Sequence, residues 1–230
     1  LARRMAAEKA AGNPFKVNLW TGASTGPELD GSLAEVDGIG QRLPYSSDPI
    51  AREKINRGEM DYLDMHLSQV APMAWQGVIG SLDTAIVEIS GIRDDGSLIP
   101  SSSVGNNKTW LDQAKRVILE VNSWQNPDLE GMHDIYYGTR LPPDRIPIPL
   151  VRPDQRIGSP YFTCDPDKIV AIVETHAPDR NLPFAAPDDK ALAIAGHIIE
   201  FLQHEVSRGR LPASLLPIQS GVGNIANAVL

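Results

Sequence analysis

Two short runs of branched apolar residues constrain the fold class of this chain most strongly. The runs Arg116–Val121 and Ile169–Val173 consist mostly of valine, isoleucine and leucine. Such runs are typical of strands in parallel sheets whose two faces are both covered by helices. Other short apolar runs alternate with helical patterns along the chain. The sequence therefore predicts an α/β fold with an open, largely parallel sheet covered by helices.

Capping residues and prolines place further elements. The pair Asp48–Pro49 predicts the start of a helix that ends at Gly58. A longer helix is predicted over Asp188–Arg208, because apolar residues recur on one of its faces. Residues 122–166 hold many prolines and no clear period, so they predict a long excursion over the surface. The predicted strands are Phe15–Trp20, Glu59–Leu63, Thr84–Ser90, Arg116–Val121, Lys168–Thr175 and Leu215–Ile218.

Charge and composition exclude several classes of function. The 230 residues carry 21 Lys and Arg against 29 Asp and Glu, and this net charge of −8 disfavours binding to nucleic acid. The apolar runs are too short to cross a membrane. The single cysteine, Cys164, cannot form an internal disulfide and is expected to be a packing or loop residue. We expect a cytoplasmic protein that binds neither nucleic acid nor membranes.

The most informative local pattern lies in residues 214–227, where a predicted strand leads into a glycine turn and the start of a helix. Such a turn directs backbone N–H groups toward one point, which is how proteins hold anionic groups. The spacing Gly221-x-Gly223-x-x-Ala226 also fits the dinucleotide fingerprint. From these residues alone, a ligand-binding loop and a glycine turn that only packs a strand against a helix are equally favoured.

A second loop of small and hydroxyl residues, Thr21–Glu28, follows the first predicted strand. Ligands of open α/β sheets bind at the carboxyl ends of the strands, so Ser24 is a candidate for facing a substrate. An ordinary turn is the alternative, and it is favoured for Thr21 and Thr25.

The histidines offer weaker candidates for chemistry. His197, Glu200 and His204 share a helix face at a spacing that could present metal ligands, but no further ligand that would complete a zinc site can be identified. We therefore expect no metal site. The pair His133–Asp134 lacks an accompanying nucleophile elbow, so no hydrolytic triad is predicted.

A series of short strings occurs in one order over nearly the whole chain. These strings are Gly22–Glu28, Asp64–Ser68, Arg93–Ser97, Val121–Asn122, Gly131–Ile135, Asp165–Glu174, Ala193–His197, Gly209–Pro212 and Gln219–Leu230. Together they resemble the acetyl-CoA hydrolase/transferase family. This family includes acetyl-CoA hydrolases and class I succinyl-CoA:acetate CoA-transferases.

The resemblance implies a covalent reaction in which a glutamate attacks an acyl-CoA thioester and is then captured as a glutamyl-CoA thioester. This glutamate is expected beyond residue 230, so no catalytic residue is expected in this chain. Residues 1–230 are then expected to be the amino-terminal domain of a two-domain enzyme, truncated at both ends, without the catalytic carboxy-terminal domain. No cofactor is implied, because coenzyme A is a substrate. The residues implied to bind it are Gly221, Val222, Gly223, Asn224 and Ile225.

The resemblance also narrows the substrates. Asn224 and Ala226 stand where related hydroxybutyrate and butyrate transferases usually carry alanine and proline, which favours acetyl-CoA, succinyl-CoA and acetate. Transfer and hydrolysis both stay open. The implied partners are acyl-CoA, small carboxylates, the carboxy-terminal domain and a second copy in a homodimer, and a eukaryotic member would be mitochondrial. The alternative function is a nicotinamide dinucleotide-binding oxidoreductase domain that uses Gly221, Gly223 and Ala226.

Overall fold

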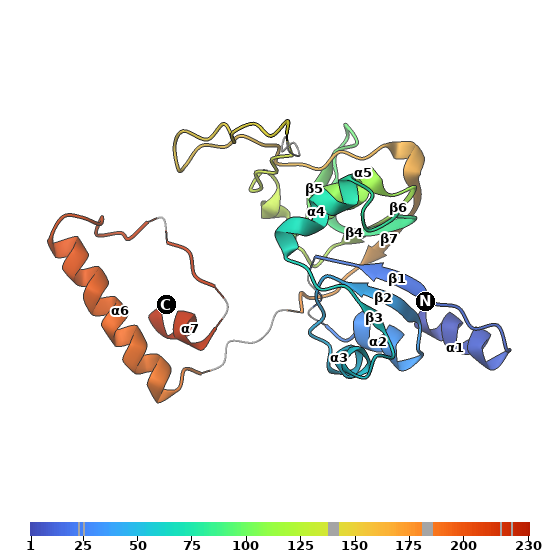
Figure 1. Ribbon diagram of the computed structural model, residues 1–230. Helices are drawn as coiled ribbons and strands as arrows, with labels where there is room; N and C mark the ends of the chain where they lie inside the picture. Colours follow the sequence, from blue (N-terminus) through green and yellow to red (C-terminus); the bar gives the residue numbers. More distant parts are fainter. Residues whose placement is uncertain (23, 25, 138–142, 181–185, 217, 222) are drawn as a thin grey trace. The chain divides into compact units, whose positions relative to one another are not determined.

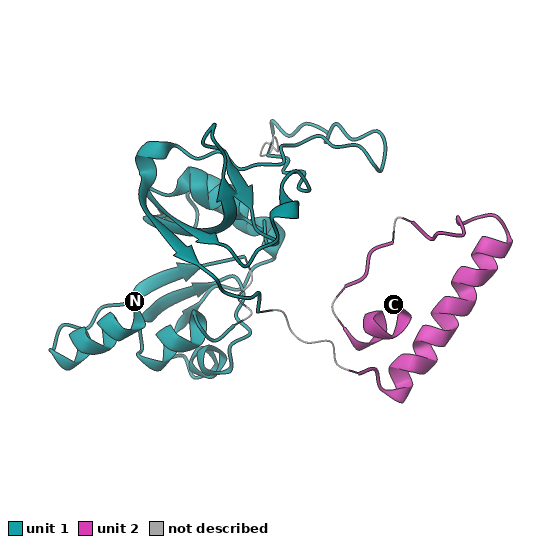
Figure 2. Ribbon diagram, turned by 180° about the vertical axis from the view of Figure 1, so that it is seen from behind, with its two compact units in different colours: residues 1–180 teal, residues 181–230 magenta. Residues whose placement is uncertain are grey.

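The computed structural model describes residues 1–230 apart from 23, 25, 138–142, 181–185, 217 and 222. The chain divides into two units, Leu1–Arg180 and Asn181–Leu230. Figure 2 shows unit 1 in teal and unit 2 in magenta. The larger unit contains two sheets with strands and helices in alternation, which confirms the predicted α/β class (Figure 1).

The first sheet of unit 1 has three parallel strands in the order β1-β2-β3. These are β1 (Val17–Trp20), β2 (Ile39–Leu43) and β3 (Asp61–Tyr62). Because neighbouring strands run the same way, the chain crosses back between them through helices. Those helices are α2 (Asp30–Glu35) and α3 (Pro49–Asn56), and α1 (Ala2–Ala10) precedes β1.

A small apolar core holds these helices to the first sheet. Met5 of α1, Leu33 of α2 and Ala51 of α3 are buried together with Ile39 of β2. The start of α3 follows from local chemistry, since the Asp48 carboxylate accepts hydrogen bonds at 2.9 Å from the backbone N–H groups of the second and third helical residues. The helix start predicted at Asp48–Pro49 is confirmed.

The second sheet of unit 1 has four strands in the order β5-β4-β6-β7. The pairs β4–β6 and β6–β7 are parallel, and β5 pairs antiparallel with β4 across a short turn. The sheet is therefore largely parallel, as expected. Its strands are β4 (Thr84–Ile92), β5 (Leu98–Pro100), β6 (Arg116–Asn122) and β7 (Ile169–Thr175).

Helices cover only one face of the second sheet within unit 1. Helix α4 (Leu67–Trp75) and helix α5 (Asn107–Gln113) contribute to a core that includes Ile89 and Leu119. On the opposite face, Ile86 is 66% exposed. Within the described residues of unit 1, β4 thus alternates between buried and more exposed residues, which is the pattern of a strand with one covered face.

The described residues of the proline-rich region 122–166 are mostly exposed, as predicted. The region contains the 3₁₀ turn η1 (Pro127–Leu129) and leads into η2 (Pro166–Lys168) ahead of β7. An isolated bridge joins Phe162 to Leu98 of β5, and a second bridge joins Ile135 to Ser159 within the region itself. Between them, residues 143–157 are mostly exposed and include Ile146, Ile148, Leu150 and Val151.

Unit 2 consists of helix α6 (Asp189–Ser207), helix α7 (Asn224–Val229) and the segment between them. The Asp188 carboxylate caps α6 by accepting a hydrogen bond from the Ala191 N–H at 2.8 Å. The strand predicted over Leu215–Ile218 is wrong for the described residues. Leu215 has a φ of 54°, in the left-handed region, which interrupts an extended strand. Residue 217 lies outside the described part. No helix in the described ranges combines the length and apolar character needed to cross a membrane.

Because helices of unit 1 cover one face of the second sheet, the same substitution at two positions of β4 should lower the free energy of unfolding by different amounts. Ile89 is fully buried, so Ile89→Ala should lower the free energy of unfolding by about 2–5 kcal/mol through lost burial and a cavity. Ile86→Ala should stay within about 0.5 kcal/mol, because that side chain is already exposed. Urea denaturation followed by tryptophan fluorescence measures both. Equal costs at the two positions would contradict the assigned faces of the strand.

Candidate functional site

The loops that follow β1 and β2 meet at the carboxyl edge of the first sheet. Ser24 pairs with Ser46 in a short parallel bridge. The Ser24 carbonyl oxygen also accepts a hydrogen bond from the Ser47 hydroxyl at 2.7 Å. Ser24 lies after β1 as the sequence suggested, but it is only 8% exposed, and Thr25 lies outside the described residues. A contact between Ser24 and a substrate stays a prediction.

An ion pair between Arg42 of β2 and Asp30 of α2 lies at the same edge. The Arg42 Nε atom is 3.1 Å from each carboxylate oxygen of Asp30, and both side chains are fully buried. The Ser46 hydroxyl donates to the same carboxylate. Sequence reasoning missed this pair. The signal that could have found it is Arg42 itself, a charged residue between Gln41 and Leu43 in a short run that precedes a capped helix.

A second polar cluster lies where β6 ends, beside the middle of β4. The Asn122 side-chain amide donates to Glu88 Oε1 at 2.6 Å, and the Gln125 amide donates to Glu88 at 3.2 Å and to Asp179 at 2.8 Å. Asn122 and Gln125 are 2% and 5% exposed. These amide donors hold the segment after β7 against the end of the sheet. Only Asn122 was part of a string that the sequence analysis singled out.

The loop after β1 is also joined to the segment after β7. Arg180 and Glu28 form an ion pair at 2.6 Å between Nη2 and Oε1, with both side chains more than half exposed. Gly26 lies beside this pair, because a Cβ atom there would come within 3.5 Å of the Arg180 side chain. A larger residue at position 26 would have to displace the pair.

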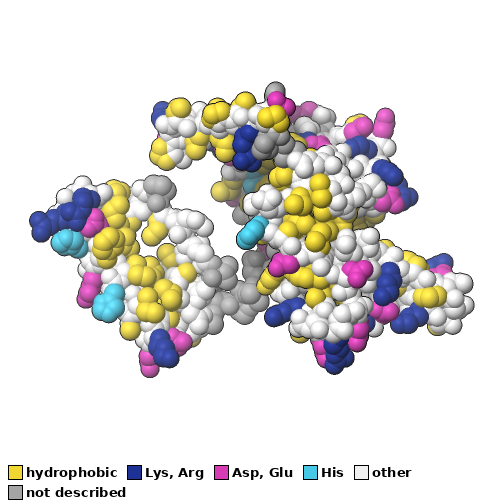
Figure 3. All heavy atoms as spheres, viewed as in Figure 1, with side chains coloured by type: hydrophobic (Ala, Val, Ile, Leu, Met, Phe, Trp, Pro, Cys, Tyr) yellow, Lys and Arg dark blue, Asp and Glu magenta, His cyan; other side chains and the backbone are white. Residues whose placement is uncertain are grey.

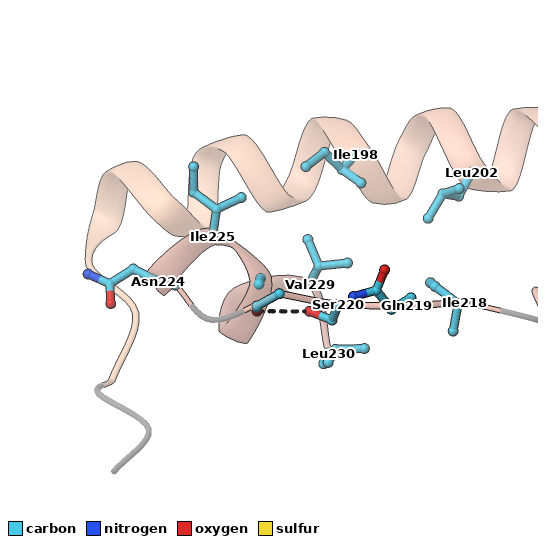
Figure 4. Close-up of a pocket in the computed structure, with 12 residues that line it drawn as sticks. Ile198, Leu202, Ile218, Gln219, Ser220, Asn224, Ile225, Val229 and Leu230 are labelled. Atoms are coloured by element: carbon cyan, nitrogen blue, oxygen red, sulfur yellow. Dashed lines mark hydrogen bonds between the residues drawn. The ribbon is translucent and has the colours of Figure 1, made fainter. Parts of the chain in front are cut away.

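In unit 2, the segment before and at the start of α7, residues 221–225, is called the glycine segment. Its described residues line a cavity of about 800 Å³ between α6 and α7. Figure 4 shows Ile198 and Leu202 of α6 on one side of the cavity and Ile225 and Val229 of α7 on the other. Of the residues implied to bind coenzyme A, Gly221, Gly223, Asn224 and Ile225 line this cavity, and Val222 lies outside the described residues.

The cavity combines an apolar wall with a few polar groups. Gln219, Ser220 and Asn224 supply polar side chains in and just before the glycine segment. Figure 3 shows hydrophobic side chains gathered over α6 and α7. Gly223 precedes α7 with a φ of 156° and a ψ of 159°, a conformation that is essentially restricted to glycine. The glycine is therefore needed for the chain to enter α7 in this direction.

Among the described residues, no histidine belongs to a cluster that could hold a metal ion. His197 Nδ1 lies 3.6 Å from Glu200 Oε2, and both side chains are about four-fifths exposed. In the loop of unit 1, the Asp134 carboxylate accepts hydrogen bonds from the backbone N–H groups of Ile157 and Gly158, so it orders the loop. Within the described ranges, no group of three or more His, Cys, Asp or Glu side chains is placed to hold a metal ion.

Comparison with known proteins decides the family. Residues 1–174 match the family described as acetyl-CoA hydrolase/transferase N-terminal domain. The chain belongs to the acetyl-CoA hydrolase/transferase family. The resemblance found in the sequence strings is thereby confirmed, and no finding supports the nicotinamide alternative.

Curated members of the family are similar along the chain. It is 46% identical to succinyl-CoA:acetate CoA-transferase of Clostridium kluyveri, over 94% of this chain and 40% of that protein. It is 38% identical to propanoyl-CoA:succinate CoA transferase of Escherichia coli, over 100% of this chain and 46% of that protein. It is 41% identical to acetyl-CoA hydrolase of Neurospora crassa, over 94% of this chain and 42% of that protein. The chain thus spans less than half the length of these relatives.

A solved structure supports the fold. The crystal structure of RipA from Yersinia pestis aligns with a TM-score of 0.61 and 20% sequence identity, over 100% of this chain and 46% of that chain. At this identity the likeness shows a shared fold and nothing of the activity.

Partial burial makes Cys164 a poor nucleophile. Removal from solvent raises the pKa of its thiol above the ordinary value, so the thiolate fraction at neutral pH falls. We expect iodoacetamide to modify Cys164 more slowly than free cysteine at pH 7, with the rate rising as the pH is raised. Mass spectrometry measures the rate, and the urea-unfolded chain is the control that should react normally. A native rate equal to that of free cysteine at pH 7 would refute this prediction.

Proposed function

We propose that this chain is part of an enzyme that transfers coenzyme A between carboxylic acids or hydrolyses acetyl-CoA. The proposed substrates are acetyl-CoA, succinyl-CoA and acetate. The observation that carries the proposal is the family match over residues 1–174, supported by relatives named as CoA-transferases and acetyl-CoA hydrolases. Both reactions are retained, because relatives of the two kinds are similar to this chain at 46% and 41% identity.

The proposed reaction is covalent. A glutamate carboxylate, expected outside residues 1–230, attacks the carbonyl carbon of the acyl-CoA thioester, and the CoA thiolate leaves as an acyl-glutamyl anhydride forms. The thiolate then attacks the glutamyl carbonyl carbon, which releases the first carboxylate and leaves a glutamyl-CoA thioester. A second carboxylate completes transfer by reversing these two steps, whereas water hydrolyses the thioester instead. Dividing one exchange into two easier steps is the advantage of a covalent nucleophile.

In this proposal the chain binds and orients the substrate. The segment Gly221–Ile225 holds coenzyme A, and Ser24 faces the substrate. A cavity of about 800 Å³ lies within the size range of cofactor sites, and its apolar wall with a few polar groups has the composition usual for them. We further propose that residues 1–230 belong to the amino-terminal domain of a two-domain homodimeric enzyme in the cytoplasm, or in the mitochondrion of a eukaryote. No cofactor is proposed besides the substrate.

The test is a turnover assay on the full-length enzyme. Acetyl-CoA is incubated with and without succinate, succinyl-CoA and free thiol are quantified, and intact mass is recorded for a CoA adduct on the protein. Succinyl-CoA formation with an adduct on a glutamate outside residues 1–230 is expected for a transferase. Succinate-independent release of thiol is expected for a hydrolase. An enzyme that shows neither turnover nor adduct would overturn the proposal.

The unusual backbone of Gly223 predicts unequal effects of two glycine substitutions. Gly223→Ala should raise KM for acetyl-CoA by roughly 5- to 150-fold, because strain in this conformation costs on the order of 1–3 kcal/mol and about 1.4 kcal/mol is tenfold in binding. Gly221→Ala should have a smaller effect, since its φ lies outside the left-handed region and an added Cβ meets open space. Steady-state kinetics of both variants measure the difference, and a larger effect at Gly221 would contradict the assigned geometry.

A further inference from the structure

Buried polar side chains are concentrated at the carboxyl edge of the first sheet. Among the described residues, nine polar or charged ones are buried, and five of these lie at the ends of β1 and β2 or in the helices that follow. A concentration of this kind is costly unless every group has a partner, so its hydrogen bonds specify one arrangement of the loops. The five residues are Ser24, Asp30, Arg42, Ser46 and Asp48.

The Arg42 guanidinium connects three separate segments. Its Nε atom donates to the Asp30 carboxylate at the start of α2. Its Nη2 atom donates to the Thr21 hydroxyl at 2.9 Å, just after β1, and to the Tyr45 carbonyl oxygen at 2.6 Å, just after β2. Its Nη1 atom donates to the Leu43 carbonyl oxygen. The planar fork of an arginine fixes these partners in one geometry, which a lysine could not do.

The network reaches the Ser24 loop through Ser46. The Ser46 hydroxyl donates to the Asp30 carboxylate, while its backbone forms the bridge with Ser24. The next residue, Ser47, donates its hydroxyl to the Ser24 carbonyl oxygen. The position of Ser24 therefore depends on Asp30, and the position of Asp30 depends on the buried arginine.

Stability alone does not explain a buried pair of this kind. The loss of solvation for two charges can exceed their mutual attraction, and apolar residues of similar volume often serve equally well. What the pair supplies here is a fixed orientation, because the donors of Arg42 together join the start of α2, the residue after β1 and the end of β2 with the residues that follow it.

We propose that Arg42 is a positioning residue, which acts through Asp30 and Ser46 to hold the Ser24 loop in the geometry that orients the acyl group for attack. This inference rests on the proposed function. Arg42 and Asp30 are fully buried and Ser46 is 4% exposed, so the role proposed for them is to hold the loop and not to contact the substrate. Loosening the network should leave coenzyme A binding by the glycine segment intact and lower the rate of the chemical step.

Ser46→Ala in the full-length enzyme tests the proposal, because it cuts the link between Asp30 and the Ser24 bridge but leaves the ion pair in place. Ser101→Ala is the matched control, since Ser101 is also buried and lies just after β5, away from this network. We expect Ser46→Ala to lower kcat at least about tenfold, because small displacements of positioning groups are costly for catalysis. KM for acetyl-CoA should change by less than about threefold, and Tm should shift by a few degrees at most, as in the control.

A second variant probes the ion pair itself. Arg42→Met combined with Asp30→Asn removes both charges together and so avoids leaving one charge buried alone. Native circular dichroism with the same selective fall in kcat supports the proposal. Should this variant fail to fold, the comparison of Ser46→Ala with Ser101→Ala decides the matter.

Two outcomes would overturn the inference, and they are distinguishable. If the wild-type enzyme is active and Ser46→Ala matches Ser101→Ala in kcat, the network has only a structural role and the proposed function stands. If the wild-type enzyme turns over no acyl-CoA, the proposed function fails and takes this inference with it.

Discussion

Parallel pairing of strands determines where the loops of unit 1 can act. Because β1 and β2 run in the same direction, the loops carrying Ser24 and Ser46 leave the sheet at one edge and can bridge to each other. The parallel set β4, β6 and β7 likewise brings Glu88 and Asn122 to the place where the segment after β7 passes. An antiparallel partner would have sent one loop of each pair to the opposite edge. The polar networks described above depend on this parallel direction of the strands.

The two units differ in where their polar groups lie. Unit 1 concentrates buried ionic and hydroxyl groups at the ends of its strands, where they fix backbone geometry. Unit 2 presents a glycine segment and apolar side chains around an open cavity, and no charged side chain is among its described lining residues. The acyl-CoA of the proposed function has a long arm and a small reactive acyl group. The long arm requires an extended contact surface, whereas the acyl group requires exact orientation.

Elements with strong local signals could be predicted, and those defined by tertiary contacts could not. Strands β6 and β7 follow from their branched apolar runs, and α3 follows from its cap. Strand β2 was missed because Arg42 interrupts its apolar pattern, and α4 was missed because Pro72 lies within it. The strand expected at Leu215–Ile218 had the right composition, but Leu215 takes a left-handed turn instead. For the site, the sequence located the Ser24 loop and the glycine segment. The Arg42–Asp30 pair joins residues 12 positions apart through folding alone.

Residues 143–157 of unit 1 expose apolar side chains, and their prolines leave the backbone with few N–H donors for pairing with another strand. Ile146 and Ile148 are more than half exposed, and they alternate with Pro147 and Pro149. Successive N–H groups of an extended chain point to opposite sides, and proline has none, so these prolines remove the donors from one side. A strand inside a growing stack must donate on both sides. The segment can therefore pair with a stack of strands on one side only, so no further strand can add beyond it. This protects an exposed apolar stretch against aggregation.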